Sequence, residues 1–263
     1  MKKLHIVGNW KMSLSKEESI ALANKLKSIS IKDNVNIEVA PTYLYLANVL
    51  EILKESDISV ISQNFDFESL GSFTGGVCLE QLKEIGVTKT ILGHSERRSK
   101  FNETEEQINK KLETILNSEL DVIFCFDSYQ QVPFELIKNN LNDNTEMKLT
   151  LAYEPTWAIG TGKTASVDHI VDIHSKVKNT LSDYSLKNIP ILYGGSVNPN
   201  NSKEILSSLN VDGVLVGGAS TKFEQLEGIV NSMTWDKLCL APEKAEENLG
   251  LDPALFKYRS RKL

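Results

Sequence analysis

Eight short apolar segments recur along the 263 residues of this chain, and most are followed by a segment with helical spacing of apolar residues. The apolar segments are rich in β-branched residues and show no strict polar–apolar alternation, which is typical of strands covered on both faces. They lie at Leu4–Val7, Ile37–Val39, Ile58–Ile61, Thr90–Leu92, Val122–Phe124, Leu149–Ala152, Ile189–Tyr193 and Val211–Val216. Eight strand–helix units in about 230 residues match a (β/α)₈ barrel in number and size, with a doubly wound open sheet as the alternative.

The first helical segment shows how the helices are encoded. Ser15 and Glu18 have the spacing of a capping box, in which each side chain bonds the other residue's backbone N–H. Leu22, Leu26 and Ile29 follow on one stripe, the face expected to pack on the strands. Similar stripes recur at Leu46, Leu50 and Leu53, at Ile170, Ile173, Val177 and Leu181, and at Phe223, Leu226 and Val230.

Polar residues and glycines gather just after several of the predicted strands. They are Asn9 and Lys11 after the first strand, His94 and Glu96 after the fourth, Glu154 after the sixth, Ser196 after the seventh, and Gly217 and Gly218 after the eighth. In a closed barrel the carboxyl ends of all strands meet at one mouth, whereas in an open sheet the first and eighth strands would be far apart. The pattern therefore favours a closed α/β barrel in a single domain.

Composition narrows the class of function. The net charge is −6 and the pI about 5.4, so we expect no binding to nucleic acid. The apolar run before Gly8 is too short for a secretory signal, and no stretch reaches the ~18 apolar residues of a membrane span. Cys78, Cys125 and Cys239 have neither metal-ligand nor disulfide spacing, so we expect no metal site and a reducing cytoplasm.

Two glycine-rich segments, Tyr193–Val197 and Val216–Ser220, follow the last two predicted strands. Because glycine has no side chain, backbone N–H groups in these segments can approach an anion, and the N-terminus of the next helix adds partial positive charge. One glycine pair would indicate only a tight turn. Two such loops on neighbouring strands, together with Gly160 and Gly162, favour a phosphate site.

Three side chains at the predicted mouth suit acid–base chemistry. Lys11 would attract an anionic substrate and stabilise negative charge as it develops, although a surface lysine is the ordinary interpretation. His94 stands where a strand opens onto a helix, a place that favours a neutral imidazole able to donate to a carbonyl oxygen. Glu154 is either a salt-bridged acid or a general base, the latter because partial desolvation raises the proton affinity of a carboxylate. The other histidines, interpreted as structural or solvated, are His5, His169 and His174.

The segment after Glu154 reads PTWAIGTGKT. A P-loop needs a glycine five residues before its Gly-Lys-Thr, and that position is Trp157. A dinucleotide-binding turn needs a strand directly ahead of its glycines, and here Glu154–Trp157 intervenes. A stiff start at Pro155 and a tip of small residues predict instead a mobile lid that expels water from the base.

The strings GNWKM, ILGHSERR, AYEPTWAIGTGKTAS, YGGSVNPNN and VDGVLVGGAS stand in this order along the chain. Together they resemble the triosephosphate isomerase family over residues 4–231. The resemblance implies a (β/α)₈ TIM barrel that interconverts dihydroxyacetone phosphate and D-glyceraldehyde 3-phosphate, in glycolysis and gluconeogenesis. It implies an enediolate formed by general acid–base catalysis, with no metal and no cofactor.

The resemblance also implies a role for each site residue. Glu154 would abstract the carbon-bound proton, and His94 would polarise the carbonyl and move protons between the two oxygens. Asn9 and Lys11 would stabilise the oxyanion. The phosphate ligands would be Gly160, Ser196, Gly217 and Gly218, and the supporting residues for His94 and Lys11 would be Ser95 and Glu96.

The segment Phe67–Gly76 is similar to the loop through which that family dimerises. The resemblance therefore implies a homodimer in which Thr74 reaches the partner's active site. The chain departs from the family at three places: Cys125–Ser128 reads Cys-Phe-Asp-Ser in place of Cys-Ile-Gly-Glu, Gly76 replaces an acid, and Lys178 replaces an arginine. These departures concern local packing or the dimer and change no residue assigned to chemistry.

We expect residues 1–232 to form the barrel domain and residues 233–263 to be a C-terminal extension of unknown role. The extension carries too many large apolar residues for a typical disordered segment, which indicates packing on the barrel or across a dimer, with a loosely attached helix as the alternative. A rival class of function is a non-catalytic barrel whose tail is a partner-binding module. The combination of base, electrophile and cation argues against it, and the GHSERR string and the lid argue against a different sugar-phosphate enzyme.

Overall fold

A computed structural model describes residues 3–67, 69–142, 144–158 and 164–232 of the chain. Three sequence predictions therefore lie outside the described residues: the phosphate-binding role of Gly160 and Gly162, the tip of the predicted lid, and the structure of the extension at 233–263.

The described strands form one eight-stranded parallel sheet, hydrogen-bonded in the order β3-β2-β1-β8-β7-β6-β5-β4. Their bounds are β1 (Leu4–Asn9), β2 (Val35–Ala40), β3 (Ile58–Val60), β4 (Lys89–Leu92), β5 (Asp121–Phe126), β6 (Leu149–Tyr153), β7 (Ile191–Tyr193) and β8 (Gly213–Val216). Each one overlaps a strand predicted from the sequence.

The sheet closes between its two end strands. Just beyond β3, Ser62 forms a parallel bridge with Thr90 of β4. The Ser62 N–H donates to the Lys89 carbonyl at 3.1 Å, and the Ile91 N–H donates to the Ser62 carbonyl at 2.9 Å. The closed barrel is confirmed, and the open-sheet alternative is wrong.

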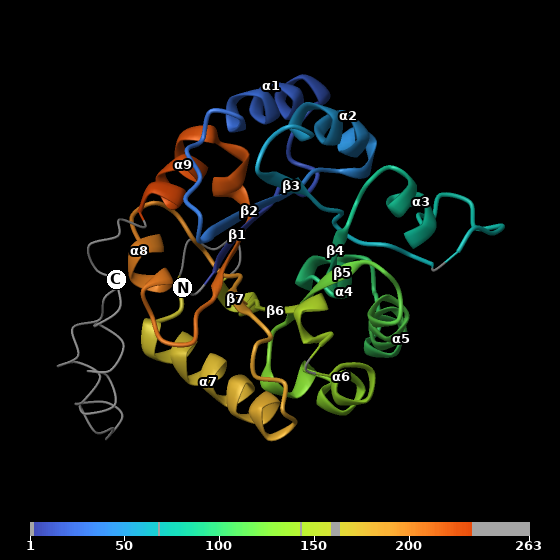
Figure 1. The fold of residues 1–263 in the computed structure, drawn as a ribbon, viewed down its shortest axis with the longest axis vertical. Coiled ribbons are helices and arrows are strands. Elements are labelled where there is room, and N and C mark those ends of the chain that lie inside the picture. Colours follow the sequence, from blue (N-terminus) through green and yellow to red (C-terminus); the bar gives the residue numbers. More distant parts are fainter. Residues whose placement is uncertain (1–2, 68, 143, 159–163, 233–263) are drawn as a thin grey trace. The chain divides into compact units, whose positions relative to one another are not determined.

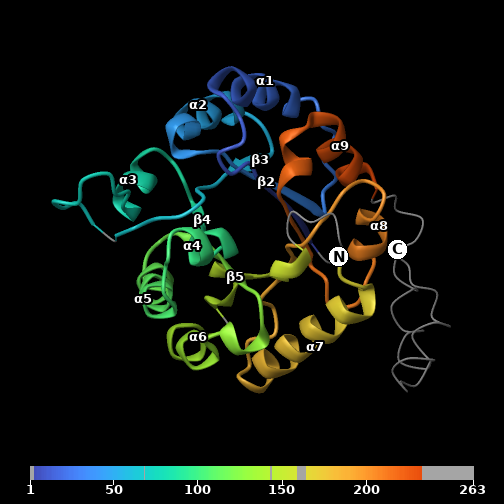
Figure 2. The same ribbon diagram turned by 180° about the vertical axis from the view of Figure 1, so that it is seen from behind.

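Helices of the described residues surround the strands as a ring (Figures 1 and 2). They are α1 (Lys16–Leu26), α2 (Tyr43–Leu53), α3 (Leu79–Glu84), α4 (Ser95–Lys100), α5 (Glu105–Leu116), α6 (Phe134–Asn140), α7 (Val167–Asp183), α8 (Ser202–Leu206) and α9 (Phe223–Asn231). The capping box predicted for α1 is present, because Glu18 N–H donates to Ser15 Oγ and Ser15 N–H donates to the Glu18 carboxylate.

Short 3₁₀ turns, η1 to η4, stand at Tyr129–Gln131, Glu146–Lys148, Thr156–Ala158 and Gly218–Thr221. Two of them, η3 and η4, directly follow the carboxyl ends of β6 and β8, where the sequence predicts site residues. The strands thus pass into tight turns at the mouth before the next helix begins.

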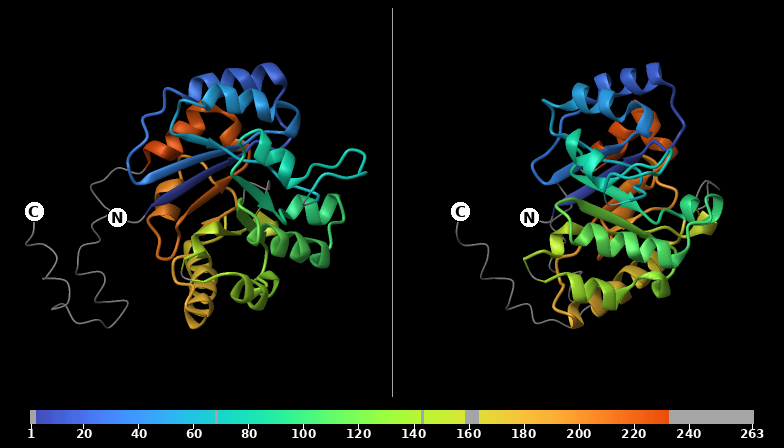
Figure 3. Two further views of the ribbon diagram at one scale, coloured as in Figure 1. Left: turned by 45° about the vertical axis from the view of Figure 1, so that its right-hand side comes forward. Right: turned by 90° about the vertical axis from the view of Figure 1, so that its right-hand side faces the viewer.

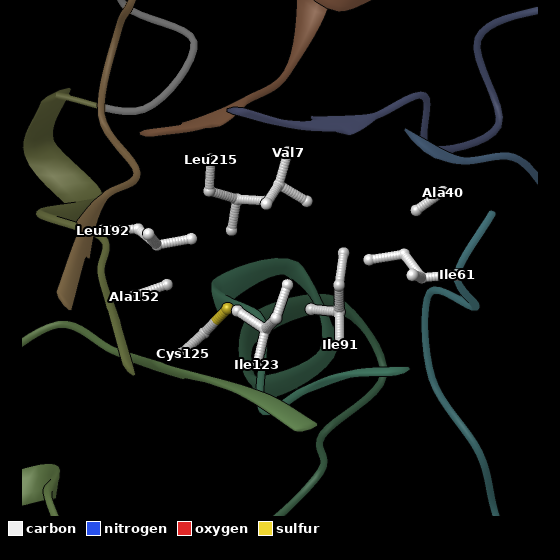
Figure 4. Close-up of a cluster of buried hydrophobic side chains, with 9 residues drawn as sticks. All are labelled: Val7, Ala40, Ile61, Ile91, Ile123, Cys125, Ala152, Leu192 and Leu215. Carbon is white, nitrogen blue, oxygen red and sulfur yellow. The ribbon is translucent and has the colours of Figure 1, made fainter. Parts of the chain in front are cut away.

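The barrel interior is filled by a layer of apolar side chains drawn from all around the sheet, and they point toward one another in Figure 4. The layer consists of Val7, Ala40, Ile61, Ile91, Ile123, Cys125, Ala152, Leu192 and Leu215, all buried. Because side chains on a strand alternate between faces, residues two positions earlier point to the same interior.

Four of those earlier positions carry titratable side chains, and they form what we call the barrel floor: His5, Glu38, Lys89 and Asp121. Glu38 Oε1 and Lys89 Nζ lie 2.6 Å apart, with only 7% and 12% of their side chains exposed. Burial lowers the pKa of His5 and raises the pKa of Asp121, since it disfavours the charged form of each. The floor therefore depends on Glu38 and Lys89 neutralising each other.

We expect Lys89→Met to lower the free energy of unfolding by about 3–5 kcal/mol, because it leaves the Glu38 carboxylate buried without its cation. The Glu38→Val/Lys89→Met double variant should recover most of that loss, since a packed apolar pair replaces a buried ion pair at little cost. Urea denaturation measures both. Lys176→Met, which breaks the exposed pair with Asp172, should cost under about 1 kcal/mol. An equal loss in the single and double variants would contradict this account of the floor.

Candidate active site

One cavity of about 320 Å³ lies at the mouth, at the carboxyl ends of the strands. Its lining brings together residues that stand up to two hundred positions apart in the chain. The predicted site residues among them are Asn9, Lys11, His94, Glu154, Ser196, Gly217 and Gly218. Glu154 and His94 line the same cavity, and His94 Nε2 lies 3.0 Å from Glu154 Oε1.

Lys11 is held in an unusual backbone conformation at the rim. Its φ is 53°, in the left-handed region that costs a residue with a Cβ roughly 1 kcal/mol or more. Two contacts fix it there: its N–H donates to Asn9 Oδ1 at 3.1 Å, and its carbonyl accepts from Gln63 Nε2 at 2.7 Å. Its ammonium lies 2.8 Å from Glu96 Oε1. In this conformation Lys11 lines the cavity at the mouth.

His94 is the N-cap residue of α4. Its Nδ1 accepts the Glu96 N–H at 3.1 Å, so Nδ1 carries the lone pair and the ring proton of the neutral imidazole belongs on Nε2. Nε2 lies 3.0 Å from Glu154 Oε1. The ring is thereby prepared as a hydrogen-bond donor toward the cavity, as expected for a neutral electrophile.

Glu154 is 2% exposed, and both of its carboxylate oxygens have partners. Oε1 faces His94 Nε2, and Oε2 accepts the Ser95 N–H at 3.0 Å. Burial is the largest single influence and acts to raise the pKa of this carboxyl. The hydrogen bond and electrostatic interaction with His94, the Ser95 N–H and the charge of Lys11 act the other way, and together they lower the pKa below its ordinary value. The expectation that desolvation raises the proton affinity of Glu154 is therefore wrong in its net direction.

The glycines after β7 make room for the acid. A Cβ at Gly194 would lie 2.7 Å from Glu154 Cγ, so any larger residue there would displace the carboxylate. A Cβ at Gly195 would collide with the Tyr193 ring. The sequence assigns these glycines only to a phosphate loop, and their steric role is visible only in the fold.

The loop after β7 also holds both flanks of the segment at 159–163. Tyr193 Oη accepts the Ala165 N–H at 3.2 Å, and Ser196 Oγ donates to the Ala158 carbonyl at 2.8 Å. Sequence reasoning did not find Tyr193, because a strand-end tyrosine carries no signal for such a contact.

The loop after β8 leaves open space beside the cavity. A Cβ at Gly218 would meet no atom within 4 Å, and one at Gly217 would lie 3.5 Å from Lys11 Cε. Packing therefore does not demand a glycine at Gly218, whereas close approach of a ligand to the backbone would. Ser196, on the neighbouring loop, lines the same cavity.

The remaining predicted residues lie around this group. Ser95 contacts Glu154 through its backbone, and Glu96 contacts both Lys11 and His94, which agrees with a supporting place for each. Thr74 stands in the segment before α3, which extends outward from the ring (Figures 1 and 3), and it does not line the cavity of its own chain. Among the described residues, no three His, Cys, Asp or Glu side chains are grouped to hold a metal ion. Within the same ranges, every helix is too short or too polar to span a bilayer.

A closed parallel barrel whose mouth joins a buried carboxylate, an imidazole donor, a cation and a glycine-lined pocket defines a (β/α)₈-barrel enzyme of the acid–base type. The family model for triosephosphate isomerase matches residues 4–233. The chain belongs to the triosephosphate isomerase family.

Relatives named triosephosphate isomerase match over most of their length. The chain is 39% identical to that of Flavobacterium psychrophilum over 246 residues, which cover 87% of this chain and 98% of the relative. It is 40% identical to that of Treponema denticola over 241 residues, or 85% and 96% of the two chains. It is 38% identical to that of Clostridium botulinum strain Loch Maree over 247 residues, or 88% and 100%.

The lowered pKa of Glu154 predicts a pH dependence of stability. A carboxyl whose folded-state pKa lies below its ordinary value of 4.5 contributes stability that is present above pH 4.5 and is lost as the pH falls through the folded-state pKa. Glu154→Gln removes this contribution. In urea unfolding across that range, we expect the wild type to lose stability more steeply than the variant, by at most about 1.4 kcal/mol per pH unit. Equal slopes would show that the carboxylate gains nothing from His94 and Ser95.

Proposed function

We propose that this chain interconverts dihydroxyacetone phosphate and D-glyceraldehyde 3-phosphate by general acid–base catalysis, as a triosephosphate isomerase. The single observation that carries the proposal is the shared cavity of Glu154, His94 and Lys11, in a chain that belongs to this family. The alternative of a non-catalytic barrel with a binding tail finds no support in the family or in the site.

In the proposed mechanism, Glu154 removes a proton from the carbon next to the carbonyl and gives an enediolate. His94 donates from Nε2 to the carbonyl oxygen, and Lys11 and Asn9 stabilise the negative charge that develops there. The reaction moves protons only, with no change in redox state and no group transfer. The side chains named here are therefore sufficient, and we propose that no cofactor takes part.

The resting contacts of Glu154 suit this role. His94 Nε2 has one proton, and in the described arrangement that proton faces Glu154 Oε1 at 3.0 Å. A substrate carbonyl must replace the carboxylate as the acceptor. When it does, Glu154 loses one of the contacts that hold its pKa down, while its burial, which acts upward, remains. Substrate binding would thus raise the proton affinity of the base at the moment it is needed.

We further propose that the phosphate is held by backbone N–H groups at Ser196, Gly217 and Gly218, with Gly160 as a fourth ligand assigned by resemblance. Open space at Gly218 and the place of all three described residues in one cavity support this assignment. A dianion bound mainly by backbone donors needs no arginine. A lid over residues 158–162 would exclude water from the base.

The direct test measures turnover of both triose phosphates by the purified chain without added cofactor, beside Glu154→Asp and His94→Gln. We expect turnover by the wild type, a fall in kcat of about a hundredfold or more in each variant, and smaller changes in KM, since both residues act on the reacting atoms. Wild-type activity with unimpaired variants would remove the assigned roles. An inactive, folded wild type would overturn the proposed function.

We propose that the chain is a homodimer in the cytoplasm. Large apolar side chains are exposed on neighbouring parts of the barrel: Met12 after β1, Leu44 in α2, Phe73 before α3, and Phe101 after α4. Phe101 also lines a groove of about 490 Å³, together with Phe65, Phe67, Arg97 and Lys111 among others. A second copy would cover this apolar surface, and the free, buried Cys78 and Cys125 suit a reducing compartment.

Sedimentation equilibrium tests the dimer. We expect a wild-type mass of twice the 29.4 kDa chain, and a shift toward the monomer in Thr74→Arg, because a buried charge at the loop tip would oppose docking. Ser207→Arg, at the exposed end of α8, is the matched control and should keep the wild-type mass. A wild-type monomer at micromolar concentration would contradict the proposal.

The boundary between barrel and extension at residue 232 is supported by the family match, which ends at residue 233. The role of residues 233–263 stays a proposal: the extension contributes to packing or assembly. A chain truncated after Ser232 with unchanged melting temperature, mass and activity would eliminate it.

A further inference from the structure

We infer that Asp127 is a positioning residue for the Glu154 carboxylate and acts through Thr156. This role rests on the proposed function, since it concerns the base of that reaction. It also gives a purpose to the altered segment Cys125–Ser128, whose Asp127 is one of the departures noted in the sequence.

The backbone ladder between β5 and β6 stops at the residue that carries the acid. Glu154 N–H donates to the Phe126 carbonyl at 2.8 Å. Because alternate residues of a strand bond to a given neighbour, the next N–H that faces β5 belongs to Thr156, and the Asp127 carboxylate accepts it in place of a backbone carbonyl. Its Oδ1 accepts the Thr156 N–H at 2.9 Å, and its Oδ2 accepts the Thr156 hydroxyl at 3.0 Å. Glu154 is therefore held on both sides along the chain.

Asp127 is itself fixed in place. Its N–H donates to Gln131 Oε1 at 2.7 Å, which ties it to η1. On the other side, the Ala158 N–H donates to the Pro155 carbonyl at 2.8 Å and closes the turn η3. The hydrogen bonds of Asp127 thus join turn η1 to turn η3.

Space behind the acid explains why such a restraint matters. A cavity of about 260 Å³ lies between α4 and this segment, lined among others by Gly93, Ser95, Ser99, Asp127, Gln131 and Thr156. Glu154 also borders it. Packing alone therefore does not fix the acid from that side, and its backbone can shift toward the cavity if Asp127 releases Thr156.

Such a shift would act on the base and not on substrate binding. The Glu154 contacts with the Ser95 N–H and with His94 Nε2, both 3.0 Å, depend on where the carboxylate stands. The proposed phosphate ligands and Lys11 come from other loops and would keep their places. Loss of Asp127 should therefore lower kcat and raise the pKa of Glu154, with little effect on KM.

The experiment compares kcat, KM and the pH profile of kcat/KM in Asp127→Ala, Asp127→Asn, Thr156→Val and Thr156→Ser. We expect Asp127→Ala to lower kcat about tenfold with KM within about twofold, and Thr156→Val to lower kcat about threefold. The acid limb of the Asp127→Ala profile should move to higher pH. Thr156→Ser, which keeps the hydroxyl, should recover most of the activity lost in Thr156→Val.

Asp172→Ala is the matched control, because it removes an exposed aspartate with a 2.8 Å partner on α7, away from the cavity. It should leave kcat and the profile unchanged. If Asp127→Ala does not fold, Asp127→Asn and Thr156→Val carry the test. An unchanged kcat, or a change confined to KM, in the folded Asp127 and Thr156→Val variants would overturn the role.

A second readout separates this inference from the proposed function. The ¹³C resonance of the Glu154 carboxyl, assigned by its absence in Glu154→Gln, can be titrated without substrate. It should titrate at higher pH in Asp127→Ala than in the wild type or in Asp172→Ala. A folded but inactive wild type would overturn the proposed function alone. If the Glu154 carboxyl titrates at the same pH in Asp127→Ala and in the wild type, the positioning role is overturned whatever the activity.

Discussion

Closure of the sheet between β3 and β4 is the constraint on which the rest of the structure depends. These end strands are joined by Ser62, whose N–H and carbonyl bond to the residues on either side of Thr90. The hydroxyl of Ser62 also donates to Thr90 Oγ1 at 2.6 Å in the buried interior. Without this bridge the sheet would open, and the loops that carry Lys11 and His94 would no longer face one cavity. The chemistry at the mouth thus depends first on the closed topology, which brings the side chains of the site together.

At the mouth, the charged and polar groups of the site influence one another's ionisation. Glu154 is buried enough to resist ionisation, yet His94 and the Ser95 N–H hold it ionised in the resting state. The left-handed Lys11 lies close enough to act in the same direction and is itself neutralised by Glu96. Each group is therefore satisfied by another member of the site. A ligand that enters must exchange those contacts, which couples binding to the proton affinity of the base.

The sequence was enough to predict the fold, but not the mutual contacts of the candidate site. Strand periodicity depends on local pattern, and that prediction holds; polar residues that the sequence places at strand ends line one cavity. The net pKa of Glu154 depends on partners 59 and 60 positions away, Ser95 and His94, so burial alone suggested the wrong direction. The place of Asp127 beside Thr156 and the pairing of Glu38 with Lys89 join different strands, and no local spacing signals them.

Each end of the barrel contains a contact between a carboxylate and a nitrogen donor, and the two contacts differ in their consequences. At the floor, Glu38 and Lys89 lie 2.6 Å apart with only 7% and 12% of their side chains exposed, and neither lines the cavity at the mouth. At the mouth, the contact between His94 and Glu154 borders a cavity of about 320 Å³. A ligand in this cavity can replace the Glu154 carboxylate as the acceptor for His94 Nε2. Both pairs consist of a carboxylate and a nitrogen donor. The difference is that only the pair at the mouth borders a cavity that a ligand can enter, and only that pair can take part in a reaction.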